Sequence, residues 1–198
     1  MDARAAQRLI DPTGLRIARV PMGRAVLTLA FVRYEDGDLD AYHELGVMLF
    51  VWGRPRGRGV YVHTLPVNEE FTLAAGRQLW GFPKFLAEIS IAEHTREATC
   101  ALRHDGADVM ELTVRRGILP LIQPSLPTYT YLDGTLRRTT WRSKGLAHGG
   151  LGGAWVELGQ HPIADELREL GLPRRARMTS VVPRFSATFE PARVIARV

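Results

Sequence analysis

The stretch "TYTYLDGTLRRTTW", residues 128–141, has the pattern of a β-hairpin. Threonine and tyrosine, which favour strands, recur around the dipeptide Asp133-Gly134. Asp-Gly is typical of the two-residue turn that joins antiparallel strands, because both of its residues readily adopt the positive φ that this turn needs. We therefore predict two paired strands with their turn at Asp133-Gly134.

The same kind of pattern extends along most of the chain. A second hairpin is predicted around Asp105-Gly106, where "EATCALRHDG" is followed by "DVMELTVRR". Residues 85–94 alternate with the period of a strand that has one face in the core. Further strands are predicted over 24–34, 43–52 and 60–65.

Helices are few in this pattern. One is predicted over 162–170, where Pro162 suits the first turn, and another over 68–76. The first dozen residues are interpreted as helical or frayed. Many short strands with few helices predict an α+β fold dominated by an antiparallel sheet or barrel, in one domain over residues 1–198.

The composition argues against several classes of protein. A hydrophobic content of 45% and a charged content of 24% are ordinary for a soluble globular protein. The net charge of +5 is dispersed, and its densest clusters, 54–58 and 174–177, contain no aromatic residues, so we expect no nucleic-acid binding. The lone Cys100 excludes an intramolecular disulfide and suits a reducing cytoplasm. No secretory signal and no membrane-spanning apolar run are found, so we expect a cytoplasmic protein without membrane partners.

Motifs for metal, phosphate and nucleophilic serine or cysteine chemistry are missing. The six histidines include no close pair at metal-ligand spacing, and Cys100 has no companion thiol, so we expect no metal site. The cluster "HGGLGG", residues 148–153, lacks the phosphate-loop pattern. We interpret it as a flexible turn between strands, within the flexible segment 144–153. No metal or organic cofactor is implied.

One lysine occupies an unusual place. Only two of the 26 basic residues are lysines, Lys84 and Lys144. Lys84 lies between Phe82-Pro83 and Phe85-Leu86 in "AAGRQLWGFPKFLAEISI", residues 74–91. An amine can lose its proton and attack a carbonyl, whereas a guanidinium stays charged. An apolar enclosure by Trp80 and Phe82 would favour the neutral amine. The alternative is a stem packed on aromatics, with an ammonium that reaches water or pairs with a carboxylate such as Glu88.

The sequence around this lysine resembles the active-site segment of the acetoacetate decarboxylase superfamily. That family carries a G-R-E/Q-x-x-G/A-F/Y-P-K stretch that ends in its Schiff-base lysine. The residues that fall on this pattern are Gly76, Arg77, Gln78, Phe82, Pro83 and Lys84. "AYHELGVMLFV", residues 41–51, is similar to the family's Y-x-E strand and places Tyr42 and Glu44 on its tyrosine and glutamate. His63 matches a family histidine, and the chain is most similar to the short actinobacterial-type branch.

The resemblance implies a Schiff-base enzyme. It implies a lyase that decarboxylates a β-keto acid through a lysine iminium, with Lys84 as nucleophile and Glu44 as general acid and base. Its small-molecule carbonyl substrate would contact residues near the lysine, namely Tyr42, His63, Arg77, Trp80, Phe82 and Phe85. Purely structural roles remain open for several of these, such as a loop anchor for Arg77 and a buried, hydrogen-bonded side chain for His63. Large members of the family assemble, so we expect a homo-oligomer, at least a dimer.

Three departures from the family pattern favour other chemistry. Phe85 stands where authentic decarboxylases carry a second lysine, and Leu29 stands at a second carboxylate position. The family's N-terminal arginine has no evident counterpart, although Arg24 or Arg33 is available as a substitute. One alternative is therefore an aldolase, dehydratase or cyclase of specialised metabolism that uses Lys84 on a larger carbonyl substrate. A second alternative is a non-catalytic barrel that binds a small ligand.

Overall fold

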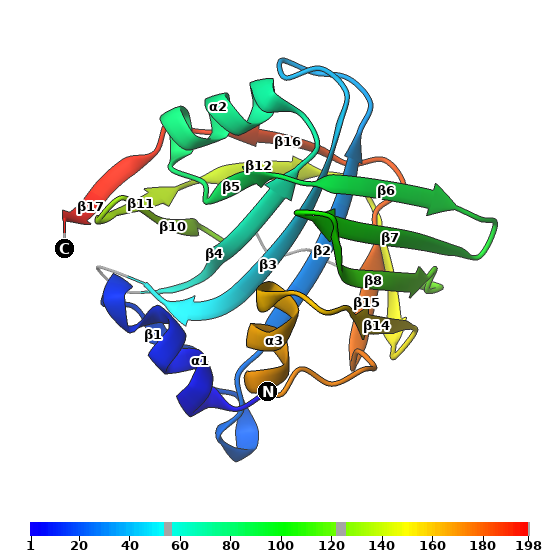
Figure 1. Ribbon diagram of the computed structural model, residues 1–198, viewed down its shortest axis with the longest axis horizontal. Helices are drawn as coiled ribbons and strands as arrows, with labels where there is room; N and C mark the ends of the chain where they lie inside the picture. Colours follow the sequence, from blue (N-terminus) through cyan, green and yellow to red (C-terminus); the bar gives the residue numbers. More distant parts are fainter. Residues whose placement is uncertain (54–56, 122–125, 198) are drawn as a thin grey trace.

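A computed structural model describes residues 1–53, 57–121 and 126–197, and most of them lie in strands (Figure 1). The α-helices are α1 (Ala3–Ile10), α2 (Glu70–Trp80) and α3 (Pro162–Glu169), and short 3-10 turns cover Asp11–Thr13 and Pro21–Gly23. The strands are β1 (Arg16–Ile17), β2 (Leu27–Tyr34), β3 (Tyr42–Trp52), β4 (Arg58–Val67), β5 (Lys84–Leu86), β6 (Glu88–Glu93), β7 (Glu97–His104), β8 (Ala107–Arg115), β9 (Leu119–Leu121), β10 (Thr128–Leu132), β11 (Thr135–Thr139), β12 (Trp141–Lys144), β13 (Ala147–Leu151), β14 (Ala154–Leu158), β15 (Met178–Val181), β16 (Ser186–Phe189) and β17 (Arg193–Arg197). The predicted α+β class is confirmed.

The largest sheet curls into a half-barrel (Figure 1). Its strands follow the order β1-β3-β4-β10-β11-β17, and β2 pairs with β3 while β5 pairs with β4. Most pairs are antiparallel, but β5 and β10 run parallel to β4. In Figure 1, α2 lies on the upper side of this sheet, and α1 and α3 lie on its lower side.

Both predicted hairpins are confirmed. β10 and β11 pair across the turn at Asp133-Gly134, with Leu132 opposite Thr135. Both turn residues have positive φ, 49° for Asp133 and 68° for Gly134, as this turn requires. β7 and β8 pair across Asp105-Gly106 and form a second sheet of order β14-β8-β7-β6. Smaller sheets join β15-β13-β9 and β12-β16.

The central strand β3 separates two packed layers, because side chains alternate across a strand. Its core-facing side chains, each at most 1% exposed, are Leu45, Val47, Leu49 and Val51. Its other face carries Glu44 and Met48, and Met48 packs on a smaller apolar cluster built from Val62, Leu65 and Phe82. The layer beneath α2 therefore holds a carboxylate beside an apolar cluster, away from the main core.

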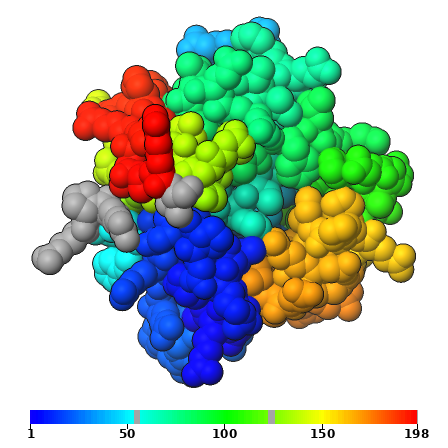
Figure 2. Space-filling model, turned by 60° about the vertical axis from the view of Figure 1, so that its left-hand side comes forward, coloured from blue at the N-terminus to red at the C-terminus, as the bar shows by residue number. Residues whose placement is uncertain are grey.

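The first dozen residues form part of the main core rather than a frayed end. Asp2 caps α1, its side chain accepting a hydrogen bond from the Ala5 amide at 2.7 Å. Ala6 and Ile10 of this helix are fully buried. The Asp2 amide also donates to the Leu170 carbonyl at 3.2 Å, just beyond α3. Figure 2 shows the N-terminal segment (blue) against the segment that contains α3 (orange).

Two predicted elements have different bounds in the structure. The helix predicted over 68–76 is α2, which begins two residues later and continues to Trp80. Asn68 is held by β3, since its side chain accepts from the His43 amide at 2.6 Å, and Gly81, with φ 63°, ends the helix. The strand predicted over 85–94 is interrupted at Ala87, so that β5 joins the large sheet and β6 the second one. Its alternation of exposure is nevertheless present, with Ile89 buried between exposed neighbours.

The interpretation of the glycine cluster as a turn between strands is confirmed for Gly152 and Gly153, which join β13 to β14 with φ of 66° and 79°. For the rest of the cluster it is wrong. Residues 148–151 belong to β13, which pairs with β15 and with β9. A Cβ on Gly149 would overlap Leu121 Cδ1 and lie 2.6 Å from the Thr179 carbonyl oxygen. Close packing of neighbouring strands, rather than flexibility, therefore accounts for this glycine.

We expect Gly149→Ala to lower the free energy of unfolding by about 1–3 kcal/mol, because backbone atoms of a neighbouring strand must move. The matched control is Gly150→Ala, where the nearest atom to an added Cβ is the Gly117 Cα at 3.9 Å. This control should stay within about 0.5 kcal/mol of the parent protein. Urea unfolding of both variants measures the difference, and equal stabilities would contradict the close packing of β13.

The structure also bears on membrane-spanning segments, on Cys100 and on the basic cluster at residues 54–58. None of the helices in the described residues is long and apolar enough to cross a membrane. Cys100 is buried, and burial raises the pKa of its thiol to about 12, which suits an inert packing residue. Residues 54–56 of the predicted basic cluster lie outside the described residues.

Candidate active site around Lys84

Lys84 is enclosed between the large sheet and α2. It begins β5, where it pairs with Leu65 of the parallel strand β4, and only 3% of the residue is exposed. Glu44 approaches it from β3, whereas Thr72 and Gly76 approach it from α2. Two strands and a helix thus meet at one amine, and β3 is distant in sequence from α2 and β5.

Three groups surround the Lys84 nitrogen. Nζ lies 2.9 Å from Glu44 Oε2, donates to Thr72 Oγ1 at 2.7 Å, and lies 5.0 Å from the centre of the Tyr42 ring. An ammonium has three donors, and a carboxylate, a hydroxyl and an aromatic face are available to them. The alternative carboxylate, Glu88, lies instead 3.7 Å from Arg103. The proposed pairing of Lys84 with Glu88 is therefore wrong, and Glu44 takes that place.

The aliphatic stem of Lys84 passes directly over Gly76. A Cβ at this position would lie 2.7 Å from both Cδ and Cε of the lysine, closer than real Cβ contacts. Thr72 and Gly76 are four residues apart and therefore share one face of α2. The same helical face thus holds both the stem and the amine of Lys84.

Burial controls the ionisation of the groups around the amine. It raises the pKa of Glu44, and the nearby Lys84 charge and its hydrogen bond offset part of that rise. It also raises the pKa of Tyr42 and of Tyr34, whose rings stack with centres 4.4 Å apart. Both tyrosines therefore remain neutral phenols at neutral pH, and Glu44 is the nearby group suited to accept a proton.

Trp80 and Phe82 form an apolar wall near the lysine but are not the groups that contact its amine. Phe82 is buried with Val62 and Leu65. The Trp80 and Phe82 rings are 6.0 Å apart, and both contact the ring of Phe189, at 5.6 and 5.9 Å. The sequence-based expectation of a purely apolar enclosure is therefore incomplete, because the amine itself meets polar groups.

Arg77 and Phe85, two further residues predicted to contact the substrate, have other partners in the structure. Arg77 Nη1 donates to the Lys84 carbonyl oxygen at 3.2 Å, so Arg77 anchors the backbone of the lysine. Phe85, the next residue along β5, packs its ring edge-on against His104 at 4.8 Å. Because successive side chains in a strand point to opposite faces, Phe85 is directed away from the Lys84 amine.

His63 is not brought to the amine. β4 has one extra residue here, since Val47 pairs with Thr64 and Met48 pairs with Val62. His63 Nε2 lies 2.7 Å from Glu166 Oε1 of α3. The imidazole thus belongs to a contact with α3, as the structural alternative for this residue allowed.

The two arginines considered as substitutes also have other partners. Arg33 pairs with Glu35 at 2.9 Å and with Glu93 at 3.1 Å, and Arg24 is exposed beside Asp2. No group of three or more histidine, cysteine, aspartate or glutamate side chains in the described ranges could hold a metal ion.

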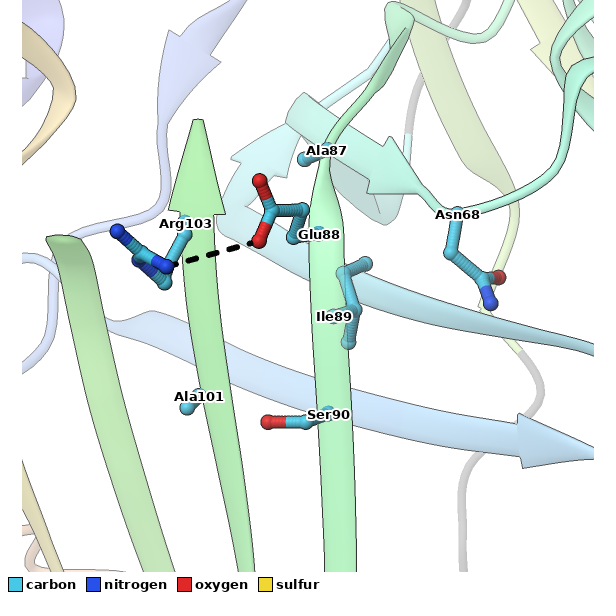
Figure 3. Close-up of a pocket in the computed structure, with 7 residues that line it drawn as sticks. All are labelled: Asn68, Ala87, Glu88, Ile89, Ser90, Ala101 and Arg103. Carbon is cyan, nitrogen blue, oxygen red and sulfur yellow. Dashed lines mark ion pairs between the residues drawn. The ribbon is translucent and has the colours of Figure 1, made fainter. Parts of the chain in front are cut away.

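A surface cavity lies elsewhere. It has a volume of about 340 Å³ and opens over β6 and β7, with Asn68 at one side and the Glu88–Arg103 ion pair at the other (Figure 3). Its other lining residues are Ala87, Ile89, Ser90 and Ala101. Its lining residues do not include Lys84.

Sequence reasoning missed two residues of the site, Thr72 and Tyr34. Thr72 is fully buried and contacts the amine, and Tyr34 stacks on Tyr42. The available signal for Thr72 was its position one helical turn before Gly76. Tyr34 had no comparable signal, since its place depends on the pairing of β2 with β3, where it lies opposite Tyr42.

Comparisons with known proteins agree on one family. The family model described as acetoacetate decarboxylase (ADC) matches residues 1–189. Acetoacetate decarboxylase 2 of Mesorhizobium japonicum is 30% identical over 165 residues, which are 74% of this chain and 61% of that protein. Acetoacetate decarboxylase of Acidiphilium cryptum is 38% identical over 86 residues, 42% of this chain and 32% of that protein. The matched segments therefore span less than two thirds of these curated relatives.

Solved structures show the same fold at low identity. A crystal structure of acetoacetate decarboxylase from Legionella pneumophila has a TM-score of 0.73 at 19% identity, covering 86% of this chain and 74% of that one. The enduracididine biosynthesis enzyme MppR, complexed with pyruvate, has a TM-score of 0.71 at 16% identity, covering 100% and 85%. From the extent of the family match, this chain belongs to the acetoacetate decarboxylase family.

Proposed function

We propose that this protein is a Schiff-base enzyme in which Lys84 condenses with a ketone or aldehyde, and that it decarboxylates a β-keto acid. The observation that carries the proposal is the buried pair of Lys84 Nζ and Glu44 Oε2 at 2.9 Å. A buried ion pair adds little net stability and can often be replaced by apolar residues without loss. A chemical role explains its presence better than a structural one.

The pair supplies both the nucleophile and its base. The ammonium of Lys84 transfers one proton to Glu44, whose pKa is raised by burial and whose carboxylate is therefore a better proton acceptor than an exposed one. The neutral amine attacks the carbonyl carbon and forms a carbinolamine. Protonated Glu44 returns the proton to the departing hydroxyl, which leaves as water and generates the iminium.

The iminium then accepts the electrons of a breaking bond. In a β-keto acid this is the bond to the carboxylate, and carbon dioxide leaves as an enamine forms. Protonation of the enamine carbon and addition of water release the ketone and restore the amine. Every step uses groups of this chain, water and the substrate.

Aldol or dehydration chemistry at Lys84 is the second candidate. Phe85, which stands where authentic decarboxylases carry a lysine, packs against His104. Arg33 pairs with Glu35 and Glu93. Neither position therefore offers the amine site an extra cation for a substrate carboxylate, which favours this candidate. The structural neighbour MppR, whose structure contains pyruvate, is consistent with other carbonyl substrates in this fold.

Incubation with acetoacetate or pyruvate, followed by borohydride reduction and intact mass, tests the proposal. We expect acetoacetate to give a reduced covalent adduct and released carbon dioxide. An adduct without carbon dioxide release would select the second candidate. The absence of any adduct with β-keto acids and aldehydes would contradict both and leave a non-catalytic ligand-binding protein.

A further inference from the structure

Thr72 contacts the Lys84 amine but was not predicted from the sequence as a residue of the site. It is fully buried on α2, and its hydroxyl oxygen accepts a hydrogen bond from Lys84 Nζ at 2.7 Å. It stands four residues before Gly76, against which the lysine stem is packed. A hydroxyl on this helix face therefore has direct access to the reacting nitrogen.

The number of protons on the nitrogen limits what Thr72 can do. After one proton has moved to Glu44, the amine retains two N–H groups and one lone pair, and only the lone pair can attack a carbonyl. The hydroxyl oxygen of Thr72 accepts from Lys84 Nζ, and a side-chain hydrogen bond also joins Thr72 to the phenol of Tyr42. The Thr72 oxygen is therefore presented to the amine as an acceptor, which binds an N–H and cannot cover the lone pair.

We propose that Thr72 is a positioning residue that holds one N–H of neutral Lys84 and so directs the lone pair away from α2, toward the incoming carbonyl. This inference rests on the proposed Schiff-base function. The charged and titratable groups that face the amine are Glu44 and Tyr42 of β3, and Tyr34 of β2 lies behind Tyr42. Thr72 is the group on α2 that links the amine to the Tyr42 phenol.

The test compares Thr72→Val, which keeps the shape but removes the hydroxyl, with Thr72→Ser, which keeps the hydroxyl. The matched control is Thr139→Val, because the Thr139 hydroxyl is also buried but has no hydrogen-bond partner among the described residues. The measurement is the rate of borohydride-trapped adduct formation with acetoacetate as a function of pH, together with the Tm of each variant.

We expect Thr72→Val to slow adduct formation by roughly 10- to 100-fold, because the lone pair is no longer directed. The midpoint of the pH profile should also move down by about one pH unit, since the ammonium has lost a hydrogen-bond acceptor. Thr72→Ser and Thr139→Val should remain within about threefold of the parent protein.

Several outcomes would overturn the inference. One is a Thr72→Val protein as fast as the parent with an unchanged midpoint. Another is a Thr72→Ser protein as slow as Thr72→Val, because a retained hydroxyl would then not preserve the rate. If Thr72→Val does not fold, Thr72→Ala is compared with Thr72→Ser by the same criteria. A parent protein that forms no adduct contradicts the Schiff-base proposal itself, which separates that failure from a failure of the Thr72 inference alone.

Discussion

Lys84→Met is expected to abolish covalent capture of carbonyl compounds and to lower turnover at least about 10³-fold, because a thioether cannot form an iminium. Methionine is unbranched and of similar length, so it can follow the path of the Lys84 stem over Gly76. Turnover of acetoacetate and intact mass after borohydride reduction measure the two effects.

The second lysine of the chain provides the control. Lys144 is exposed in β12, and Lys144→Met makes the same chemical change away from the site. Its capture and turnover should match those of the parent protein. Retention of turnover in Lys84→Met, or its loss in Lys144→Met, would contradict the assignment of the nucleophile.

The stability of Lys84→Met is expected to depend on pH in a defined direction. The Lys84 charge offsets part of the burial-induced rise in the pKa of Glu44, so its removal raises that pKa further. A carboxyl group with a raised folded-state pKa stabilises the fold fully below its unfolded-state pKa, and this stability is lost as pH rises through the folded-state pKa. The Tm of Lys84→Met should therefore fall relative to the parent as pH rises above 4.5, the ordinary pKa of a glutamate carboxyl. Lys84→Met/Glu44→Gln should lose this pH dependence while remaining inactive.

Glu44→Gln is expected to reduce turnover by about 10²- to 10⁴-fold, the usual contribution of a general acid and base. Glutamine keeps the shape and hydrogen-bonding capacity of the side chain but cannot take the proton of the Lys84 ammonium. Capture by borohydride should persist during long incubations, since the nucleophile is still present. Steady-state turnover and the time course of capture therefore separate the loss of the base from the loss of the lysine.

The control for Glu44→Gln is Glu88→Gln. Glu88 is an exposed glutamate whose neighbour is Arg103, on the surface cavity rather than at the lysine. Its turnover should equal that of the parent protein. If Glu44→Gln retained turnover within a few-fold of the parent, Glu44 would be a structural partner of Lys84 and not its base.

The strands were predictable from sequence because their signals are local. The turns at Asp105-Gly106 and Asp133-Gly134 follow from residues that accept positive φ, and alternation marks the core face of a strand. Glycine positions were harder to interpret, because a glycine can either end an element with positive φ or make room for a close contact within one. Gly76 continues α2 and makes room for Lys84, whereas Gly81 ends the helix with φ 63°.

The site was predictable only as far as its residues belong to a sequence motif. Lys84 and Glu44 fall on family patterns, and the structure places them 2.9 Å apart. Thr72 and Tyr34 reach the site through the packing of α2 and the register of β2 with β3, which no short motif records. His63 falls on a family position but is directed to α3 by an extra residue in β4, a detail of register that sequence spacing does not reveal.

Peptide mapping of the borohydride-reduced protein is the most direct test of the role of Lys84. After incubation with acetoacetate, trypsin cleaves at Arg77 and Arg96, and a modified Lys84 blocks cleavage between them, leaving one peptide of residues 78–96. We expect the added mass on this peptide and none on Lys144 or on the amino group of Met1. An adduct distributed over Lys144 and Met1, or no adduct on residues 78–96, would contradict the account.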